Sequence, residues 1–384
     1  MTPLRLVSAG VSAVAVAYGL ARYGYGLLLP DIRSELGLST ELLGLIGTLS
    51  YVAYLLATAA VTAFAAQTGP RLPVALGGAF GVVGMVSVSL SEGATALAAG
   101  VLVAGASSAF AFPPFADAVG RCLLPEHRGR ALSAISSGTG WGVLVSGPLA
   151  LLVGGSWRTA WLAFAALGMI ATLWAAWVLP ARPLGGGERA PARLHLSWFA
   201  CPRSAPLLVG ALLVGLGSSV YWTFAVDYVV GYGALSASAG RLLLVLVGVA
   251  SILGSFGGDL IELVGARRAL WLGSSLLALS LALLAAAPGS WLAVGPSAVL
   301  FGAAYNVVVA IQAIWSARVF SGRPSAGLGA AMFMNGLGLM LGPLAGGVVA
   351  GQLGFPAAFV ASAVVVSAVA LLYPREELQA VAAS

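Results

Sequence analysis

Long apolar runs constrain this chain more than any other feature. They recur along its whole length and carry almost no charge. Each is about 20 residues or longer, which is enough for a helix to cross a bilayer core of roughly 30 Å. Only 8% of the 384 residues are charged, whereas a soluble domain has about 25%. The chain is therefore predicted to be an all-α integral membrane protein.

We expect twelve transmembrane helices, joined mostly by short links marked by Gly, Pro, Ser or charge. The predicted spans are 6–29, 41–65, 72–90, 94–118, 129–154, 158–179, 205–231, 238–260, 268–287, 291–315, 326–350 and 355–373. The longest link, 181–203, is rich in Gly, Pro and Arg and divides the spans six and six. It predicts an N-terminal bundle over 1–180, a cytoplasmic linker, and a C-terminal bundle over 204–384.

The arginines predict the orientation of the bundle. If the N-terminus lies in the cytoplasm, 14 of the 18 arginines fall on the inner side. Only Arg33, Arg158 and Arg241 then lie outside, and Arg22 lies within a span. Because cytoplasmic loops carry an excess of basic residues, we expect a multi-pass protein with both termini in the cytoplasm.

The two halves repeat weakly at an offset of 195 residues. The segment that begins with Gly147 and Pro148 in span 5 matches the one that begins with Gly342 and Pro343 in span 11. Other matches over about 40 residues keep the same register. Two similar halves are typical of secondary transporters, whose substrate site lies between the halves near the middle of the membrane.

Two motifs point to one family. The pattern GxxxGPxxGG is complete in span 11 and partial in span 5, where Leu151 and Leu152 replace its last two glycines. A weak form of GxxxDRxGRR lies between spans 8 and 9. Together with the twelve spans, the repeat and the linker, these motifs resemble the major facilitator superfamily over essentially the whole chain. The residues of these motifs that we expect to serve gating or helix packing are Gly147, Pro148, Glu262, Gly265, Arg267, Arg268, Gly338, Gly342 and Pro343.

The resemblance implies alternating access around a central cavity lined chiefly by spans 1, 4, 7 and 10. The stretch Ala15–Pro30 resembles an uncharacterised bacterial branch of the family, so the expected location is the bacterial cytoplasmic (inner) membrane. We expect a monomer that handles a small-molecule substrate within the lipid bilayer and is not an enzyme. No substrate follows from the resemblance.

Residue usage excludes several other classes. All 18 basic residues are Arg, so a P-loop lysine and an ATP-driven pump of the usual kind are excluded. The same absence removes Schiff-base chemistry. The two histidines lie far apart in loops, which argues against a metal centre. We therefore expect no cofactor, and the dispersed arginines give no reason to expect nucleic acid.

Arg22 is the main candidate for binding substrate. It lies about eight residues before Pro30, or about 12 Å below the outer end of the helix. Charged groups at such depth usually face a protein interior or a cavity, and a guanidinium suits an anionic or polar group of a substrate. The alternative is an arginine that extends to the membrane interface. Tyr18 and Tyr25 flank Arg22 at helical spacing and are candidates to line the same cavity.

Further aromatic and polar residues are candidates for binding substrate, and for each of them packing between helices is the alternative. The aromatic candidates for stacking on substrate are Tyr51, Tyr54, Trp141, Tyr221 and Trp222. The uncharged polar candidates are Asn306 and Asn335, for which hydrogen bonding between helices is an equal alternative.

Two acidic residues are candidates for proton coupling. Asp227 is the acidic residue well inside span 7, where loss of water disfavours the charged form of a carboxylate and favours proton uptake. Its alternatives are a helix-end residue facing water or a pair with Arg241. Asp117 lies near the inner end of span 4, where a polar contact of the inner gate is an equal reading.

The sequence thus predicts a secondary active transporter for a small organic solute, with an anionic group held near Arg22 and proton coupling as a hypothesis. The alternative is a proton-driven efflux antiporter for drugs or amphiphilic metabolites. In the family that the chain resembles, the motif of span 11 is an antiporter motif, so its complete form favours efflux. Its loss in span 5, and the absence of the arginine that exporters of this family often carry in span 4, argue against efflux.

Overall fold

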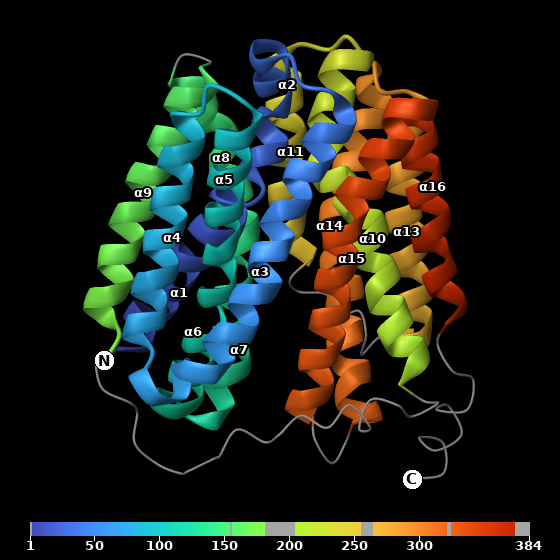
Figure 1. Cartoon of the computed structure of the whole chain (residues 1–384). Coiled ribbons are helices and arrows are strands. Elements are labelled where there is room, and N and C mark those ends of the chain that lie inside the picture. Colours follow the sequence, from blue (N-terminus) through green and yellow to red (C-terminus); the bar gives the residue numbers. More distant parts are fainter. Residues whose placement is uncertain (1, 154–155, 181–203, 255–263, 321–323, 373–384) are drawn as a thin grey trace.

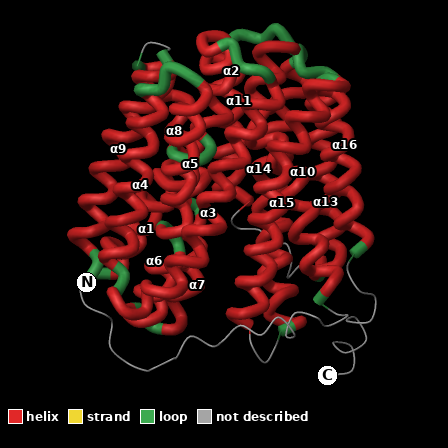
Figure 2. Tube along the Cα trace, in the orientation of Figure 1, coloured by secondary structure: helices red, strands yellow, loops and turns green. Residues whose placement is uncertain are grey.

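The computed structural model describes residues 2–153, 156–180, 204–254, 264–320 and 324–372. Within these ranges the regular structure is entirely helical, and the helices run side by side along the length of the molecule (Figure 2). The all-α fold class is confirmed. The predicted linker 181–203 and the end of predicted span 8 lie outside the described residues.

The helices before the linker form the first half of the molecule. They are α1 (Pro3–Val14), η1 (Ala15–Leu20), α2 (Gly24–Leu36), α3 (Thr40–Thr68), α4 (Arg71–Ser89), α5 (Ala94–Ala106), η2 (Ser107–Phe110), α6 (Pro113–Cys122), α7 (Pro125–Ser136), α8 (Gly138–Leu152) and α9 (Trp157–Val178). The second half follows the linker. It contains α10 (Ala205–Asp227), η4 (Tyr228–Tyr232), α11 (Ala237–Gly254), α13 (Ala266–Ala286), α14 (Trp291–Val319), α15 (Pro324–Leu353), α16 (Phe355–Ser367) and η5 (Ala368–Leu371).

These helices match the predicted spans. Within the described residues, eleven continuous helical stretches are long and apolar enough to cross a membrane. The shorter apolar stretch Phe355–Leu371 corresponds to the twelfth predicted span. Several spans consist of two or three consecutive helical segments, as in the first one, where α1, η1 and α2 follow each other.

The first span is longer than predicted because Pro30 does not end it. Helix α2 continues through Pro30 and stops just before Gly37, which adopts a left-handed conformation with a φ of 62°. Glycine tolerates this conformation and commonly ends helices. The extension places Asp31, Arg33 and Glu35 on a helix rather than in a loop, so their side chains point in directions set by the helix.

The two halves lie beside each other as two bundles (Figure 1). We call the side where α1 begins and η5 ends the terminal side, and the side where α2 ends the distal side. The halves meet through α2 with α10, α3 with α15, and α8 with α11. In Figure 1 the ribbons of the two bundles lie together toward the distal side and separate toward the terminal side.

The buried apolar residues follow the same division. One cluster crosses from the first half to the second and contains Leu28, Trp161 and Tyr221. Two further clusters each belong to one half, one around Phe115 of α6 and one around Trp315 of α14. A continuous core therefore joins the halves on the distal side, and separate cores stabilise each half on the terminal side.

Glycine allows the two halves to approach closely. A Cβ at Gly26 of α2 would collide with the carbonyl oxygen of Trp222 in α10. A Cβ at Gly44 of α3 would likewise collide with the carbonyl oxygen of Pro343 in α15. Small residues at such crossings let helix backbones pack directly against one another.

The GxxxGPxxGG motif occurs in α8 and in α15, and its glycines face different neighbours in the two helices. Gly147 of α8 faces the other half, where an added Cβ would lie 2.9 Å from the carbonyl oxygen of Arg241. Pro148 next to it is exposed. Gly338 and Gly342 of α15 instead face α10 within their own half, with no room for a Cβ. Gly147 in α8 thus serves contact between the halves. In α15, Gly338 and Gly342 serve contact within one half, whereas Pro343 and Gly347 of the same motif meet α3 of the other half.

The inner-loop motif is described only in part. Gly265 precedes α13 with a φ of 80°, a left-handed value that favours glycine. Arg267 and Arg268 follow in the first turn of α13, and both are exposed. Glu262, predicted to act with them at the inner gate, lies outside the described residues.

Candidate functional site

Arg22 lies where the first span changes its helical geometry. In η1, the Ala21 amide donates to the Val16 carbonyl at 2.8 Å and the Tyr23 amide donates to the Tyr18 carbonyl at 3.0 Å. These bonds span five residues instead of four, and such wide turns are frequent at functional sites. Residues 21–23 form a turn before α2 begins, so the arginine lies at a junction between two helical segments.

Three tyrosines surround the Arg22 guanidinium. Its Cζ atom lies 4.2 Å from the ring centre of Tyr51, 4.4 Å from that of Tyr54 and 5.6 Å from that of Tyr18. Such contacts between a cation and aromatic faces are favourable, more so when water is excluded. The side chain is only 5% exposed. The structure therefore favours a buried cation over the alternative of an arginine extending to the interface.

The rings leave part of the guanidinium unsatisfied. Among the described residues, Nε and Nη2 of Arg22 have no hydrogen-bond partner. Burying a charge is costly unless it is paired and hydrogen-bonded. Aromatic faces offset some of this cost, and an anionic ligand would offset more of it.

Arg22 borders a small cavity of about 10 Å³ between the two halves, roughly the room that one water molecule needs. Its walls include Arg22, Ser50 and Tyr51 from the first half and Trp222 and Thr223 from the second. Each of these side chains is at most 5% exposed. A cavity with both apolar walls and a few polar groups is typical of small-molecule sites.

An aromatic stack crosses the boundary between the halves beside this cavity. The rings of Tyr23 and Trp222 lie 4.0 Å apart at an interplanar angle of 18°. The other contacts of Trp222 are edge-on, to Phe301 at 5.2 Å and Tyr305 at 5.9 Å. Trp222 was predicted from the sequence, but Tyr23, Ser50 and Thr223 were not, because only the wide turn and the contact between halves bring them to the cavity.

Two predicted tyrosines are held by packing. The Tyr25 hydroxyl donates to the Leu43 carbonyl at 2.8 Å and ties α2 to α3, although the residue also borders the cavity. Tyr221 is fully buried, stacks on Phe301 at 3.8 Å and shares a hydrogen bond of 3.1 Å with Ser297. Tyr221 thus supports Phe301, which in turn contacts Trp222.

Both predicted asparagines bond helix backbones. Asn306 of α14 donates to the Ser251 carbonyl of α11 at 3.0 Å. Asn335 of α15 donates to the Ala211 carbonyl of α10 at 3.3 Å. The reading as hydrogen bonds between helices therefore describes both, and neither borders the cavity at Arg22.

Trp141 lies away from the cavity. It is 46% exposed and begins an exposed row on α8 that continues with Val145, Pro148 and Leu152. These positions share one helix face at spacings of three and four residues. An exposed apolar face on a membrane helix is suited to lipid, and Trp141 does not border the cavity at Arg22, so its stacking on substrate stays a prediction.

The acidic candidates have different partners from those predicted. The buried Asp227 pairs with Arg33 of α2 at 2.6 Å, whereas Arg241 pairs with Asp31 at 3.5 Å. The predicted alternative, a pair between Asp227 and Arg241, is therefore not the one formed. Both observed pairs join the first half to the second on the distal side.

Asp117, the other acidic candidate, pairs within its own helix. It pairs with Arg121 one turn later on α6 at 2.8 Å, and both side chains are exposed. The residue lies near the terminal side. Its pair stays within one helix and connects no two elements.

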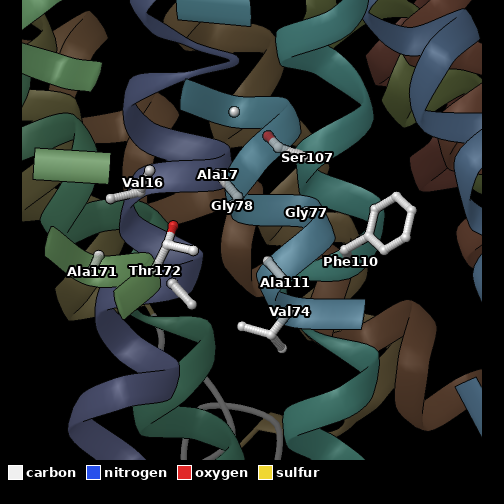
Figure 3. A pocket seen from close by; sticks show the side chains of 12 residues that line it. Val16, Ala17, Val74, Gly77, Gly78, Ser107, Phe110, Ala111, Ala171 and Thr172 are labelled. Carbon is white, nitrogen blue, oxygen red and sulfur yellow. The ribbon is translucent and has the colours of Figure 1, made fainter. Parts of the chain in front are cut away.

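A second hollow, of about 20 Å³, lies within the first half between η1, α4 and α9 (Figure 3). Its two hydroxyl-bearing side chains are already satisfied. Ser107 donates to the Ala104 carbonyl and Thr172 to the Gly168 carbonyl, each at 2.6 Å. No charged side chain lines the hollow. The hollow thus lacks any group to bind a polar ligand, in contrast to the cavity at Arg22.

Comparison with known proteins agrees with this architecture. The model of the major facilitator superfamily matches residues 11–294 and 207–383. The chain belongs to this superfamily. It is a transporter of the secondary type rather than an enzyme, as predicted.

Solved structures share the fold. The nucleoside transporter NupG has a TM-score of 0.79 at 14% identity, covering 97% of this chain and 98% of its own. A bacterial homologue of the human lysosomal transporter Spinster, in an inward-facing and unoccupied conformation, has a TM-score of 0.77 at 17% identity, with 97% of each chain covered. At these identities the likeness concerns the fold alone.

Two relatives match by sequence. The chloramphenicol resistance protein of Streptomyces lividans is 28% identical over 67% of this chain and 64% of its own length. The transcription regulatory protein OpdE of Pseudomonas aeruginosa is 27% identical over 63% of this chain and 61% of its own. The match therefore spans less than two thirds of either relative.

Proposed function

We propose that this transporter moves a small organic solute with an anionic group, and that Arg22 binds this group. The observation that carries the proposal is a buried guanidinium with two unpaired donors beside a cavity between the halves. Arginine binds carboxylates through paired N–H groups in a planar fork. An anion at this place would neutralise the buried charge and satisfy its free donors.

The arrangement of the halves supports alternating access. The ion pairs and the glycine contacts hold the halves together on the distal side. On the terminal side the buried cores are separate. With the termini in the cytoplasm of the inner membrane, as the arginine distribution predicts, the joined distal side is the outer side, which is closed in this arrangement.

Proton coupling through Asp227 extends the proposal. The carboxylate is 2% exposed and its charged form is held by Arg33. Protonation removes the negative charge, so it weakens the pair that joins the halves. A proton taken up there would favour opening of the distal side, and its release would favour closure.

Counterflow in proteoliposomes tests the proposal. Acetate, pyruvate, succinate and benzoate would be compared with lipophilic cations and neutral amphiphiles, using wild type and Arg22→Gln in parallel. We expect exchange of at least one carboxylate by the wild type and its loss in Arg22→Gln. Carboxylate exchange that persists in Arg22→Gln would overturn the role of the arginine.

Efflux of drugs or amphiphilic metabolites is the second candidate. Two observations favour it: a relative named for chloramphenicol resistance, and the aromatic walls formed by Tyr23, Tyr51 and Trp222. Exchange of neutral amphiphiles by the wild type, undiminished in Arg22→Gln, would establish this function instead.

A further inference from the structure

We propose that Ser50 and Trp222 complete a carboxylate subsite with Arg22, so that one bound carboxylate contacts both halves of the transporter. Arg22 and Ser50 belong to the first half and Trp222 to the second. The inference rests on the proposed function, because it takes Arg22 as the residue that binds the anion. It adds two specificity-determining residues and narrows the ligand group to an anion whose oxygens only accept hydrogen bonds, for which a carboxylate is the form tested.

Three residues that border the cavity carry hydrogen-bond donors without a partner. Within the described part of the chain, no hydrogen-bond partner exists for Nε and Nη2 of Arg22, Oγ of Ser50 or Nε1 of Trp222. All three residues border the small cavity between the halves and are at most 5% exposed. Most buried polar side-chain atoms in proteins have partners. Buried atoms without a hydrogen-bond partner also occur elsewhere in the described structure, but four of them belong to these three cavity residues, and we take them as donors for a ligand.

Ser50 differs from other buried serines of the bundle. Ser108 donates to the Gly105 carbonyl at 2.9 Å, and Ser146 donates to the Val143 carbonyl at 2.7 Å, each one turn back along its own helix. Such local bonds are the usual way to satisfy a hydroxyl in a membrane helix. Ser50 makes no such bond in the described structure; its Oγ lies beside Gly105 of α5 and is left without a protein partner.

The chemistry of these donors indicates which ligand group can bind them. A guanidinium and an indole N–H donate hydrogen bonds but cannot accept them. The ligand group must therefore accept several bonds at once. A carboxylate offers two oxygens and about four lone-pair sites, and it carries no hydrogen that would face another donor. An amide of the same shape has one oxygen and brings an NH₂ group that would face these donors.

The Trp222 indole is fixed before any ligand binds. Its face lies against Tyr23 at 4.0 Å and its edge contacts are with Phe301 and Tyr305. A donor held in place costs less conformational entropy on binding. Since Trp222 comes from the second half, a carboxylate bound by all three residues would also hold α3 and α10 together below the distal ion pairs.

Two conservative variants test the subsite. Trp222→Phe removes the N–H and keeps an aromatic ring for stacking, and Ser50→Ala removes only the hydroxyl. Matched controls exist for both. Trp161→Phe and Thr48→Val each remove a buried donor that lacks a partner in the described structure and does not border the cavity. All variants would be full-length proteins in proteoliposomes, each first shown to be monodisperse by gel filtration.

The readout is the half-saturating concentration in counterflow for acetate, pyruvate, succinate and benzoate, each beside its amide. We expect Trp222→Phe and Ser50→Ala each to raise this value about tenfold for the transported carboxylate, because a hydrogen bond to a charged group is worth about that factor or more. The two controls should stay within about twofold of wild type. The amides should not compete with the carboxylates in the wild type.

The outcomes separate this inference from the proposed function. If Arg22→Gln abolishes carboxylate exchange while Trp222→Phe and Ser50→Ala keep the wild-type value, the subsite is overturned and the role of Arg22 stands. If carboxylate exchange survives in Arg22→Gln, both are overturned. If Trp222→Phe does not fold, Ser50→Ala against Thr48→Val decides the question alone.

Discussion

The Arg33 guanidinium lies 2.6 Å from the buried Asp227 carboxylate, and this ion pair joins the first span of one half to the first span of the other. Two residues earlier on α2, Asp31 pairs with Arg241 of α11 at 3.5 Å. The end of α2 thus presents a negative and then a positive charge, and each faces its opposite in the second half. Both contacts must break when the distal side opens.

Glu35 holds the same helix end to its own half. Its carboxylate accepts a hydrogen bond of 2.6 Å from the Trp157 indole and pairs with Arg158. Arg158 also donates to the Ser91 carbonyl at 2.7 Å, which adds the link between α4 and α5 to the cluster. We infer that α2 moves with the first half when the two distal pairs break.

Loss of the Arg33 pair should open the distal side. Arg33→Gln leaves the Asp227 carboxylate buried without its cation, and breaking a buried pair in this way costs about 3 kcal/mol or more. An Ile32→Cys reporter, at a fully buried position between the two pairs, should then react on the order of tenfold faster with a membrane-impermeant maleimide. The reporter would be placed in a background without Cys122 and Cys201.

Asp117→Asn serves as the control for this experiment, because its pair with Arg121 lies within α6. It should leave the reactivity of the reporter unchanged. Equal reactivity of the reporter in wild type and in Arg33→Gln would show that the pair does not hold the distal side closed.

Exchange of the two charges should restore function in part. Arg33→Asp and Asp227→Arg each place two like charges at one contact, so each alone should reduce transport by about tenfold or more. The double variant restores opposite charges across the same contact. We expect a coupling of about 1 kcal/mol or more in a double-mutant cycle of initial transport rates, as for residues in direct contact. Additive losses would mean that the two residues act independently.

A methyl group at Gly44 should also prevent distal closure. The Cβ of alanine would collide with the Pro343 carbonyl, a backbone group that cannot rotate away. We expect Gly44→Ala to reduce transport severalfold and to raise the reactivity of the Ile32→Cys reporter. Gly120→Ala, which meets no atom within 4 Å, is the control. Wild-type transport in Gly44→Ala would contradict the close approach of α3 and α15.

The spans could be predicted because length and hydropathy alone determine whether a helix crosses a membrane. The partners of the charged residues could not. Arg33 follows Pro30, which reads as the end of a helix, and only the continuation of α2 to Gly37 turns its side chain toward Asp227. Which helices pair across the two halves depends on which helix faces meet in the fold, and the local sequence pattern does not identify these faces.

The site shows the same limit. Arg22 and its neighbours Tyr51 and Tyr54 were predicted because a charge and aromatic rings stand out in apolar spans. Trp141 and Trp222 look equivalent by composition, although the first is exposed and the second is buried against Tyr23. The apolar row that follows Trp141 at spacings of three and four residues was the available signal for an exposed position.

The tyrosine rings around Arg22 should matter through their faces rather than their hydroxyls. Tyr54→Phe keeps the ring at 4.4 Å from the guanidinium, whereas Tyr54→Leu removes it. Desolvated contacts between a cation and an aromatic ring are worth about 1–2 kcal/mol. We therefore expect Tyr54→Leu to lower the melting temperature of the purified protein by several degrees and Tyr54→Phe to change it little.

Phe80→Leu is the control, because it removes an exposed aromatic ring on α4. It should leave the melting temperature nearly unchanged. A melting temperature as low in Tyr54→Phe as in Tyr54→Leu would assign the effect to the hydroxyl and contradict stabilisation of the buried cation by the ring.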